Sequence, residues 1–201
     1  TTCLMMVALM CRVTMGTPVR TSMDTASVAG AQSCTEHAKT LLTTLKSVLN
    51  KDKPTLFHGF KCADLDTEVI PNSSTVAACQ PYEDTTCSDQ RRSSFNETDC
   101  LASMREDLRH YQDKLAEYAE SLSKFDAVTE LKPILISVRD LQQNCPPLST
   151  NETEKSPTNS PGPVDSFEER MSLCKQLKGF HLRAVTMNRA LGYVSAGDYK
   201  R

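Results

Sequence analysis

Two helical patterns that meet with almost no linker, near residue 125, constrain the fold of this chain more than any other feature. The first covers about residues 100–125 and the second about residues 126–144. Helices joined by so short a connection pack as antiparallel neighbours. The chain also has no tryptophan and only 7 glycines, a composition that favours helices over a β-sandwich or barrel.

Four segments carry apolar side chains at the spacing of an amphipathic helix. We expect these helices over about residues 34–50, 100–125, 126–144 and 166–194. Their apolar stripes are Ala38, Leu41, Leu42, Leu45, Val48 and Leu49; then Leu101, Met104, Leu108, Tyr111, Leu115, Tyr118, Leu122 and Phe125; then Val128, Leu131, Leu135, Val138 and Leu141; and last Met171, Cys174, Leu177, Phe180 and Val185. Ser33 with Glu36, Asp99, and Asp165 with Glu168 are the expected caps of the first, second and last helices. Pro133 is expected to kink the third helix or to mark its first turn.

Long connections, about residues 51–99 and 145–164, flank the central pair of helices. Long connections allow the first two helices to run parallel, and likewise the last two. The sequence therefore predicts an all-α, up-up-down-down four-helix bundle.

The beginning of the chain is typical of a signal peptide. Leu4 to Met10 forms an apolar run too short to span a bilayer. We expect a leader over about residues 1–22, cleavage between Gly16 and Ala31, a first basic region upstream of this sequence, and a folded domain over about residues 32–197. Sequons at Asn72, Asn96 and Asn151, all in expected loops, also favour a secreted, extracellular glycoprotein without membrane insertion.

Of 9 cysteines, Cys3 and Cys11 lie in the expected leader. The others are Cys34, Cys62, Cys79, Cys87, Cys100, Cys145 and Cys174. In an oxidising compartment they indicate disulfides before metal ligands, and no C-x-x-C occurs. An odd number suggests one free thiol or one bond to another chain. We expect disulfides to order the first crossover, which has no sustained helical period.

No catalytic or cofactor motif is present. The four histidines, His37, His58, His110 and His181, are scattered, and there is no H-E-x-x-H, G-x-S-x-G or P-loop. A net charge of −2 argues against a nucleic-acid partner. We expect no enzyme activity, no metal and no cofactor.

The last helix has an apolar side and a basic side with Lys175, Lys178, Arg183 and Arg189. Three interpretations are open from this pattern: a core helix with a solvated basic face, a partner-binding helix, and a membrane-surface helix.

Several segments resemble the interleukin-12 alpha-subunit family of cytokines. They are STVAACQP at 74–81, RRSSF at 91–95, CLASMREDLRHYQ at 100–112, and LCKQLKGFHLRAVTMNRALGYV at 173–194. The resemblance covers about Cys34 to Val194, and its small departures point to a distant vertebrate orthologue. It implies a long-chain cytokine bundle with a disulfide-stapled first crossover. It also implies a subunit that pairs with a soluble-receptor-like beta subunit and signals through cell-surface receptors in immune regulation.

The resemblance implies three intrachain disulfides: Cys34–Cys87, Cys62–Cys174 and Cys79–Cys100. The chain is shorter than the family pattern between Cys79 and Cys87, where the cysteine that links alpha to beta belongs. Cys87 could be that linker instead, although its spacing to Cys100, with RRSSF between them, fits the intrachain cysteine. Cys145 has no counterpart; it links to the partner from a new position or is a free thiol, and we favour the link.

By the same resemblance, the last helix docks the beta subunit. Arg189 is the residue expected to enter an acidic pocket, supported by Arg183 and Tyr193; without the resemblance, an exposed surface arginine is the better interpretation. Phe167 matches a receptor-contacting aromatic, and the alternative is a hydrophobic staple on the end of the bundle.

Other functions stay open at this point. Within the same class they are the alpha subunit of a sister heterodimer and a self-sufficient long-chain cytokine. From another class, a secreted helical lipid carrier would need an apolar cavity among the helices.

Overall fold

The fold is taken from a computed structural model of the chain. It describes residues 25–52, 54–65, 74–80, 96–121, 128–149 and 166–196, without the side chains of 25–29, 31 and 74. The expected leader, the sequons at Asn72 and Asn151, and Cys87 lie outside these residues, as do Leu122 and Phe125.

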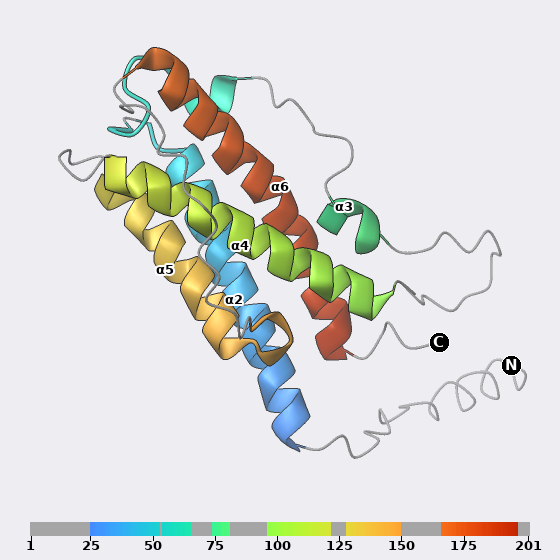
Figure 1. Ribbon diagram of the computed structural model, residues 1–201. Helices are drawn as coiled ribbons and strands as arrows, with labels where there is room; N and C mark the ends of the chain where they lie inside the picture. Colours follow the sequence, from blue (N-terminus) through green and yellow to red (C-terminus); the bar gives the residue numbers. More distant parts are fainter. Residues whose placement is uncertain are drawn as a thin grey trace, which may run out of the picture.

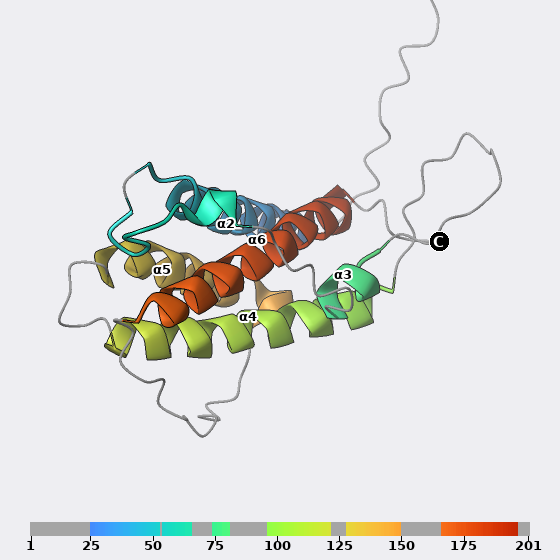
Figure 2. The ribbon, with the colours of Figure 1, turned by 90° about the horizontal axis from the view of Figure 1, so that it is seen from above.

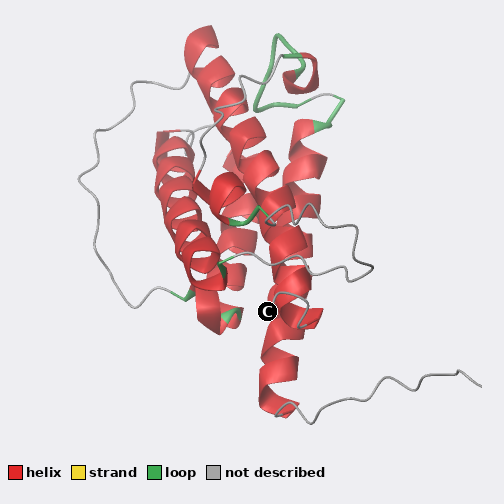
Figure 3. Cartoon of the chain, turned by 90° about the vertical axis from the view of Figure 1, so that its right-hand side faces the viewer, coloured by secondary structure: helices red, strands yellow, loops and turns green. Residues whose placement is uncertain are grey.

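The described residues are helical, without a strand, which confirms the all-α prediction (Figure 3). The four long helices are α2 (Thr25–Leu49), α4 (Glu97–Ser121), α5 (Val128–Asn144) and α6 (Phe167–Ala196). A short helix, α3 (Ser74–Ala78), and two 3-10 turns, η1 (Cys62–Asp64) and η2 (Pro146–Leu148), lie in the connections.

Contacts between the helices give their directions. Thr35, in the first half of α2, donates to the Leu191 carbonyl near the end of α6, and Lys46 near the end of α2 lies close enough to act on His181 in the first half of α6, so these two helices are antiparallel. Tyr111 meets Arg183 and Tyr118 meets Ser172, so α4 is also antiparallel to α6. Figure 1 shows the result: α2 and α4 run one way and α5 and α6 run back, in the order that the connection lengths predict.

Each of α2 and α4 packs against both α5 and α6. Seen from above, α6 crosses the bundle between α2 and α4 (Figure 2). One core of buried side chains joins the four helices, and Leu41, Leu108, Ile134 and Phe180 are among its fully buried members. The predicted stripes of the first three helices hold within the described residues, although Leu42, Tyr118, Val128 and Leu135 are only partly buried.

The stripe of α6 was predicted wrongly at its last residue, and its first residue, Met171, is only partly buried. Cys174, Leu177 and Phe180 are buried, but Val185 is 44% exposed. The core stripe continues instead through Ala184, Met187 and Leu191. The predicted step of five residues from Phe180 to Val185 does not fit a turn of 3.6 residues, which brings Ala184 to the core face.

The helix starts differ from the predictions. The first helix already begins at Thr25, so Ser33 and Glu36 lie inside it and do not cap it. Its alanine-rich first turns are good helix formers, and none of these residues is a proline. Pro133 lies inside α5, beyond the helix start at Val128, and so does not mark the first turn.

Side chains cap two of the helices, α4 and α6. Asn96, and not Asp99, is the cap of α4, because its Oδ1 accepts a hydrogen bond from the Asp99 N–H at 3.3 Å. Ser166 caps α6, because its Oγ accepts from the Glu169 N–H at 3.2 Å; the predicted cap Asp165 lies outside the described residues. Both follow the rule that a short polar side chain binds the N–H three residues on.

The start of the first crossover is ordered by packing as well as by disulfides. Leu56 and Phe57 are buried in the core. Gly59, with φ of 96°, completes the turn in which the Phe60 N–H binds the Phe57 carbonyl at 3.1 Å. The prediction that disulfides order the crossover is therefore incomplete, because packing orders its start as well.

Glu130 anchors this stretch to α5. Its carboxylate accepts hydrogen bonds from Lys51 Nζ at 2.8 Å, from the N–H and hydroxyl of Thr55, and from the Leu56 N–H at 3.2 Å. Burial alone would raise the pKa of this carboxyl, but the hydrogen bonds outweigh burial and lower it. A charged Glu130 therefore holds the crossover against the bundle.

Candidate partner-binding face and disulfide framework

Three disulfides link the described residues: Cys34–Cys145, Cys62–Cys174 and Cys79–Cys100. The last two confirm the predicted pairs. Cys62–Cys174 clamps the first crossover to α6, and Cys79–Cys100 ties α3 to the start of α4. The separations of 111 and 112 residues in the two longer links each correspond to about 4–5 kcal/mol in the chain-entropy account of disulfide stabilisation.

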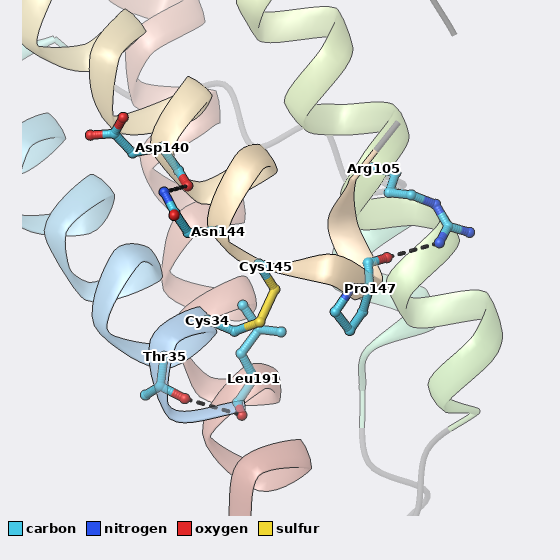
Figure 4. Close-up of a disulfide and its surroundings, with 8 residues drawn as sticks. All are labelled: Cys34, Thr35, Arg105, Asp140, Asn144, Cys145, Pro147 and Leu191. Atoms are coloured by element: carbon cyan, nitrogen blue, oxygen red, sulfur yellow. Dashed lines mark hydrogen bonds between the residues drawn. A yellow bond between two sulfur atoms is a disulfide. The ribbon is translucent and has the colours of Figure 1, made fainter. Parts of the chain in front are cut away.

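The predicted Cys34–Cys87 pair is wrong, and so is the prediction that Cys145 is free or bonded to another chain. Cys34 is bonded to Cys145, with 4.7 Å between their Cα atoms (Figure 4). The cause is the antiparallel packing of α2 and α5, which brings the two cysteines together and also places Thr44 beside Ser137. Cys87 lies outside the described residues.

A buried polar cluster joins α4 to α6. Arg183 Nη1 donates to the Tyr111 hydroxyl at 2.7 Å and to the Gly179 carbonyl at 3.2 Å. Its Nε lies 3.2 Å from Asp107 Oδ2, an ion pair held by charge, because neither atom completes an aligned hydrogen bond. The Tyr111 ring stacks on Phe180 with 4.3 Å between centroids. Burial is the main cause of the raised pKa of Tyr111, so its hydroxyl stays protonated.

This cluster changes the expected role of Arg183. Its side chain is 12% exposed, as is that of Asp107. A guanidinium already committed to a tyrosine and a carboxylate of its own chain is not available to a partner. Arg183 therefore positions α6 against α4 and is not part of the exposed basic face.

Lys178 on the basic face of α6 is, like Arg183, engaged by groups of its own chain. Its Nζ binds the carbonyl oxygens of Ala63, at 3.2 Å, and Leu65. Lys178 therefore holds the crossover next to the Cys62–Cys174 disulfide. Of the four predicted basic residues, Lys175 and Arg189 are the exposed ones.

Arg189 belongs to an exposed row on α6 that we call the outer stripe: Leu182, Val185 and Arg189. Residues three and four apart on a helix share a face, and these lie at that spacing. Leu182 is 40% and Val185 44% exposed, two of the few large apolar side chains that the described surface exposes. Tyr193, one turn beyond Arg189, is half-buried and packs against the core.

Phe167 lies at the start of α6 with 51% of its surface exposed. Its ring meets Phe60 edge-on, with 5.4 Å between centroids, and Arg170 lies 6.0 Å from the ring centre. Phe60 in turn lies 5.8 Å from the buried Phe57. Phe167 therefore packs on the bundle end with one side and presents the other to solvent.

Sequence reasoning missed Leu182 and Val185 as candidate surface residues, because it merged two apolar rows of α6 into one. The core row repeats at Leu173, Leu177, Phe180, Ala184, Met187 and Leu191. The second row starts at Leu182 and keeps its own three- and four-residue steps to Arg189. The offset between these two rows in the sequence could have indicated that Leu182 and Val185 lie outside the core.

No helix among the described residues is long and apolar enough to cross a membrane. In the same residues, no three or more histidine, cysteine, aspartate or glutamate side chains form a group that could hold a metal ion.

Four long helices, two running one way and two back, with long connections between the first two and between the last two, form the arrangement of the helical cytokines. The interleukin-12 alpha-subunit family matches residues 3–197. The chain therefore belongs to the interleukin-12 alpha-subunit family, a family of cytokines and not of enzymes.

Curated relatives agree with this assignment. Interleukin-12 subunit alpha of Equus caballus is 31% identical over 192 residues, covering 83% of this chain and 84% of the relative. The subunit of Mus musculus is 28% identical, covering 84% and 87%. That of Homo sapiens is 29% identical, covering 81% and 83%. These values fit a distant orthologue.

Proposed function

We propose that this chain is the alpha subunit of a secreted heterodimeric cytokine, and that its beta subunit docks on the outer stripe of α6. The proposal rests on the different placements of Arg183 and Arg189. Arg183 is occupied inside the bundle, whereas Arg189 is exposed at the end of a row that begins with two exposed aliphatic side chains. That combination is typical of the centre of a protein–protein interface.

The chemistry of the stripe specifies the partner surface. A planar guanidinium pairs best with a carboxylate that accepts two hydrogen bonds. Leu182 and Val185 need an apolar surface that excludes water from that ion pair. The expected partner surface is therefore an acidic pocket with an apolar rim, and Tyr193 is expected at its edge.

Co-expression with a beta subunit tests the proposal. The expected result is that the alpha chain is secreted in a complex with the beta subunit, and that receptor-bearing cells respond to the complex. Secretion of a stable monomer that activates those cells alone would contradict the heterodimer and would indicate a self-sufficient cytokine. A complex that forms only with the beta subunit of a sister cytokine would assign the chain to that heterodimer.

We also propose Phe167 as a receptor contact. It lies at the end of the bundle, and about half of the residue's surface is exposed although its ring packs on Phe60. Phe167→Ala is expected to reduce signalling by the assembled heterodimer while assembly itself is retained. Unchanged signalling would leave Phe167 with the packing role alone.

Because Cys145 is bonded to Cys34, we propose that Cys87 is the cysteine that links the alpha chain to its beta subunit. The three disulfides use six of the seven cysteines that follow the expected leader, and Cys87 is the one they leave. On non-reducing gels, Cys87→Ser is expected to separate the two subunits. A covalent heterodimer that persists in this variant would show that Cys87 is not the link.

A further inference from the structure

The outer face of α5 exposes two apolar residues that the core does not use. Ile136 is 53% exposed, more than any other large apolar side chain that the structure describes, and Pro133, three residues before it, is also exposed. Residues three apart on a helix share a face, so the two form a single apolar surface. Neither the outer stripe nor the proposed contact at Phe167 includes them.

Both residues are poor choices for this face if they serve the helix alone. A proline inside a helix removes a backbone hydrogen bond, and a β-branched side chain loses rotamer freedom there. Burial offsets that cost at the neighbouring Ile134, which is fully buried, but offers little at Pro133 and Ile136. Residues that break a local rule without a gain in packing are expected at functional surfaces.

Two cations flank the apolar pair. Lys132 lies four residues before Ile136 and Arg139 three residues after it, so the three share a face over about 10 Å of helix. Both cations are exposed, and neither forms an ion pair with another residue that the structure describes. Of the two acidic residues of α5, Glu130 is buried and Asp140 is half-buried. The exposed charge of this face is therefore positive.

The side of α2 next to this face has its hydroxyl groups already bonded. Thr44 Oγ1 lies 3.3 Å from Ser137 Oγ, which places these residues at the contact between α2 and α5. Thr44 donates to the Thr40 carbonyl at 2.9 Å, and Thr40 donates to the Glu36 carbonyl at 3.0 Å. Ser137 donates to the Pro133 carbonyl at 2.9 Å. This contact region therefore favours an apolar partner over a polar one.

We propose that Lys132, Pro133, Ile136 and Arg139, which we call the α5 patch, dock the ectodomain of a cell-surface receptor while the beta subunit occupies the outer stripe. The inference rests on the proposed function. The two surfaces can be occupied together, because α5 and α6 lie on opposite sides of the bundle and each packs against both α2 and α4 (Figure 1). The receptor surface is expected to offer an apolar centre with carboxylates on both sides of it.

Charge argues against a second copy of this chain as the occupant. Two patches that meet in parallel place Lys132 against Lys132 and Arg139 against Arg139. Two that meet antiparallel place Lys132 against Arg139, so like charges oppose both arrangements. A membrane surface is also a poor match, because helices that bind one insert several large apolar side chains and this patch has only Ile136.

The test uses the alpha chain in complex with its beta subunit, labelled and bound to receptor-bearing cells. Ile136→Asp is expected to raise the half-saturating concentration at least about 10-fold, because it places an anion against an acidic surface with an apolar centre. Arg139→Glu changes the charge alone and is expected to shift binding in the same direction. Ile136→Leu, which keeps the aliphatic contact, should bind like the parent. Ala116→Asp, the same new charge on the exposed face of α4, is the matched control and should also bind like the parent.

Assembly with the beta subunit shows that each variant is folded and separates the two proposals. Parent-like saturation of the cells by an assembled heterodimer with either Ile136→Asp or Arg139→Glu would overturn this inference alone. Failure of the parent chain to assemble with the beta subunit would overturn the proposed function. Binding of the heterodimer to vesicles of phosphatidylserine and phosphatidylcholine, lost in Ile136→Asp, would assign the patch to a membrane surface and overturn receptor docking.

Discussion

Arg183 of α6 donates a hydrogen bond of 2.7 Å to the hydroxyl of Tyr111 on α4, and its guanidinium carbon lies 5.3 Å from the centre of the same ring. With Asp107 completing the cluster, this contact fixes how α6 is rotated against α4. The rotation in turn sets which residues of α6 face outward. The partner-binding face that we propose thus depends on a charged residue that does not belong to it.

Arg183→Ala is expected to lower the free energy of unfolding by about 2–4 kcal/mol, because it leaves the Asp107 carboxylate buried without its counter-charge. Chemical denaturation measures the change. Arg189→Ala is the matched control and is expected to stay within about 0.5 kcal/mol of the parent, since Arg189 is exposed. Equal effects of the two substitutions would contradict the different placements of these arginines.

Gly179 leaves room for the cluster. A Cβ at this position would lie 3.1 Å from the Tyr111 hydroxyl and 3.4 Å from Arg183 Nη1, whereas one at Gly192 meets nothing within 4 Å. Alanine is favoured over glycine in a helix by about 1 kcal/mol. Gly192→Ala is therefore expected to stabilise the protein by about 0.5–1 kcal/mol.

Gly179→Ala is expected to give none of this gain, because Tyr111 is stacked on Phe180 and its hydroxyl cannot withdraw freely. The gain should return when Tyr111→Phe removes the hydroxyl. Unfolding free energies of the two single variants and the double variant measure this coupling. A Gly179→Ala variant as stable as Gly192→Ala would show that the cluster does not limit this position.

Glu130 makes the stability of the bundle depend on pH. Its folded pKa lies below its unfolded value, so the stabilisation is present above the unfolded pKa, about 4.3, and is lost as the pH falls through the folded pKa. At neutral pH, Glu130→Gln is expected to cost about 2 kcal/mol, because an amide cannot accept as well from Lys51, Thr55 and Leu56.

The difference between parent and Glu130→Gln is expected to shrink as the pH falls below about 4. Denaturation series at neutral and acidic pH measure it. Glu120, an exposed carboxylate on α4, is the matched control, and Glu120→Gln should change little at any pH. A constant difference between parent and Glu130→Gln across the acidic range would exclude the charged form of Glu130 as the anchor.

The sequence predicted the helices and most of their buried faces, because the 3.6-residue period is a local property that each segment carries by itself. Leu41, Leu108 and Leu141 show this: each lies in the core where its stripe places it. The short connection required an antiparallel central pair, and the long connections allowed the directions that the other helices have. Two disulfides followed from the family resemblance.

The failures share a different cause, which is contact between segments far apart in the sequence. Cys34 bonds to Cys145 because antiparallel helices bring the two together, and no spacing along the chain specifies that meeting. Arg183 was assigned to the surface because its partners Asp107 and Tyr111 lie on another helix. Long-range pairing of this kind depends on the packed bundle and not on the local pattern.

The affinity of the alpha chain for its beta subunit tests the central claim most directly. Arg139 on α5 is an exposed arginine on another helix and provides the matched control. Arg189→Ala is expected to raise the Kd at least about 30-fold, corresponding to about 2 kcal/mol, because a central arginine anchor loses its carboxylate. Arg139→Ala should leave the Kd unchanged. A Kd equally unaffected by both substitutions would contradict docking of the beta subunit on the outer stripe.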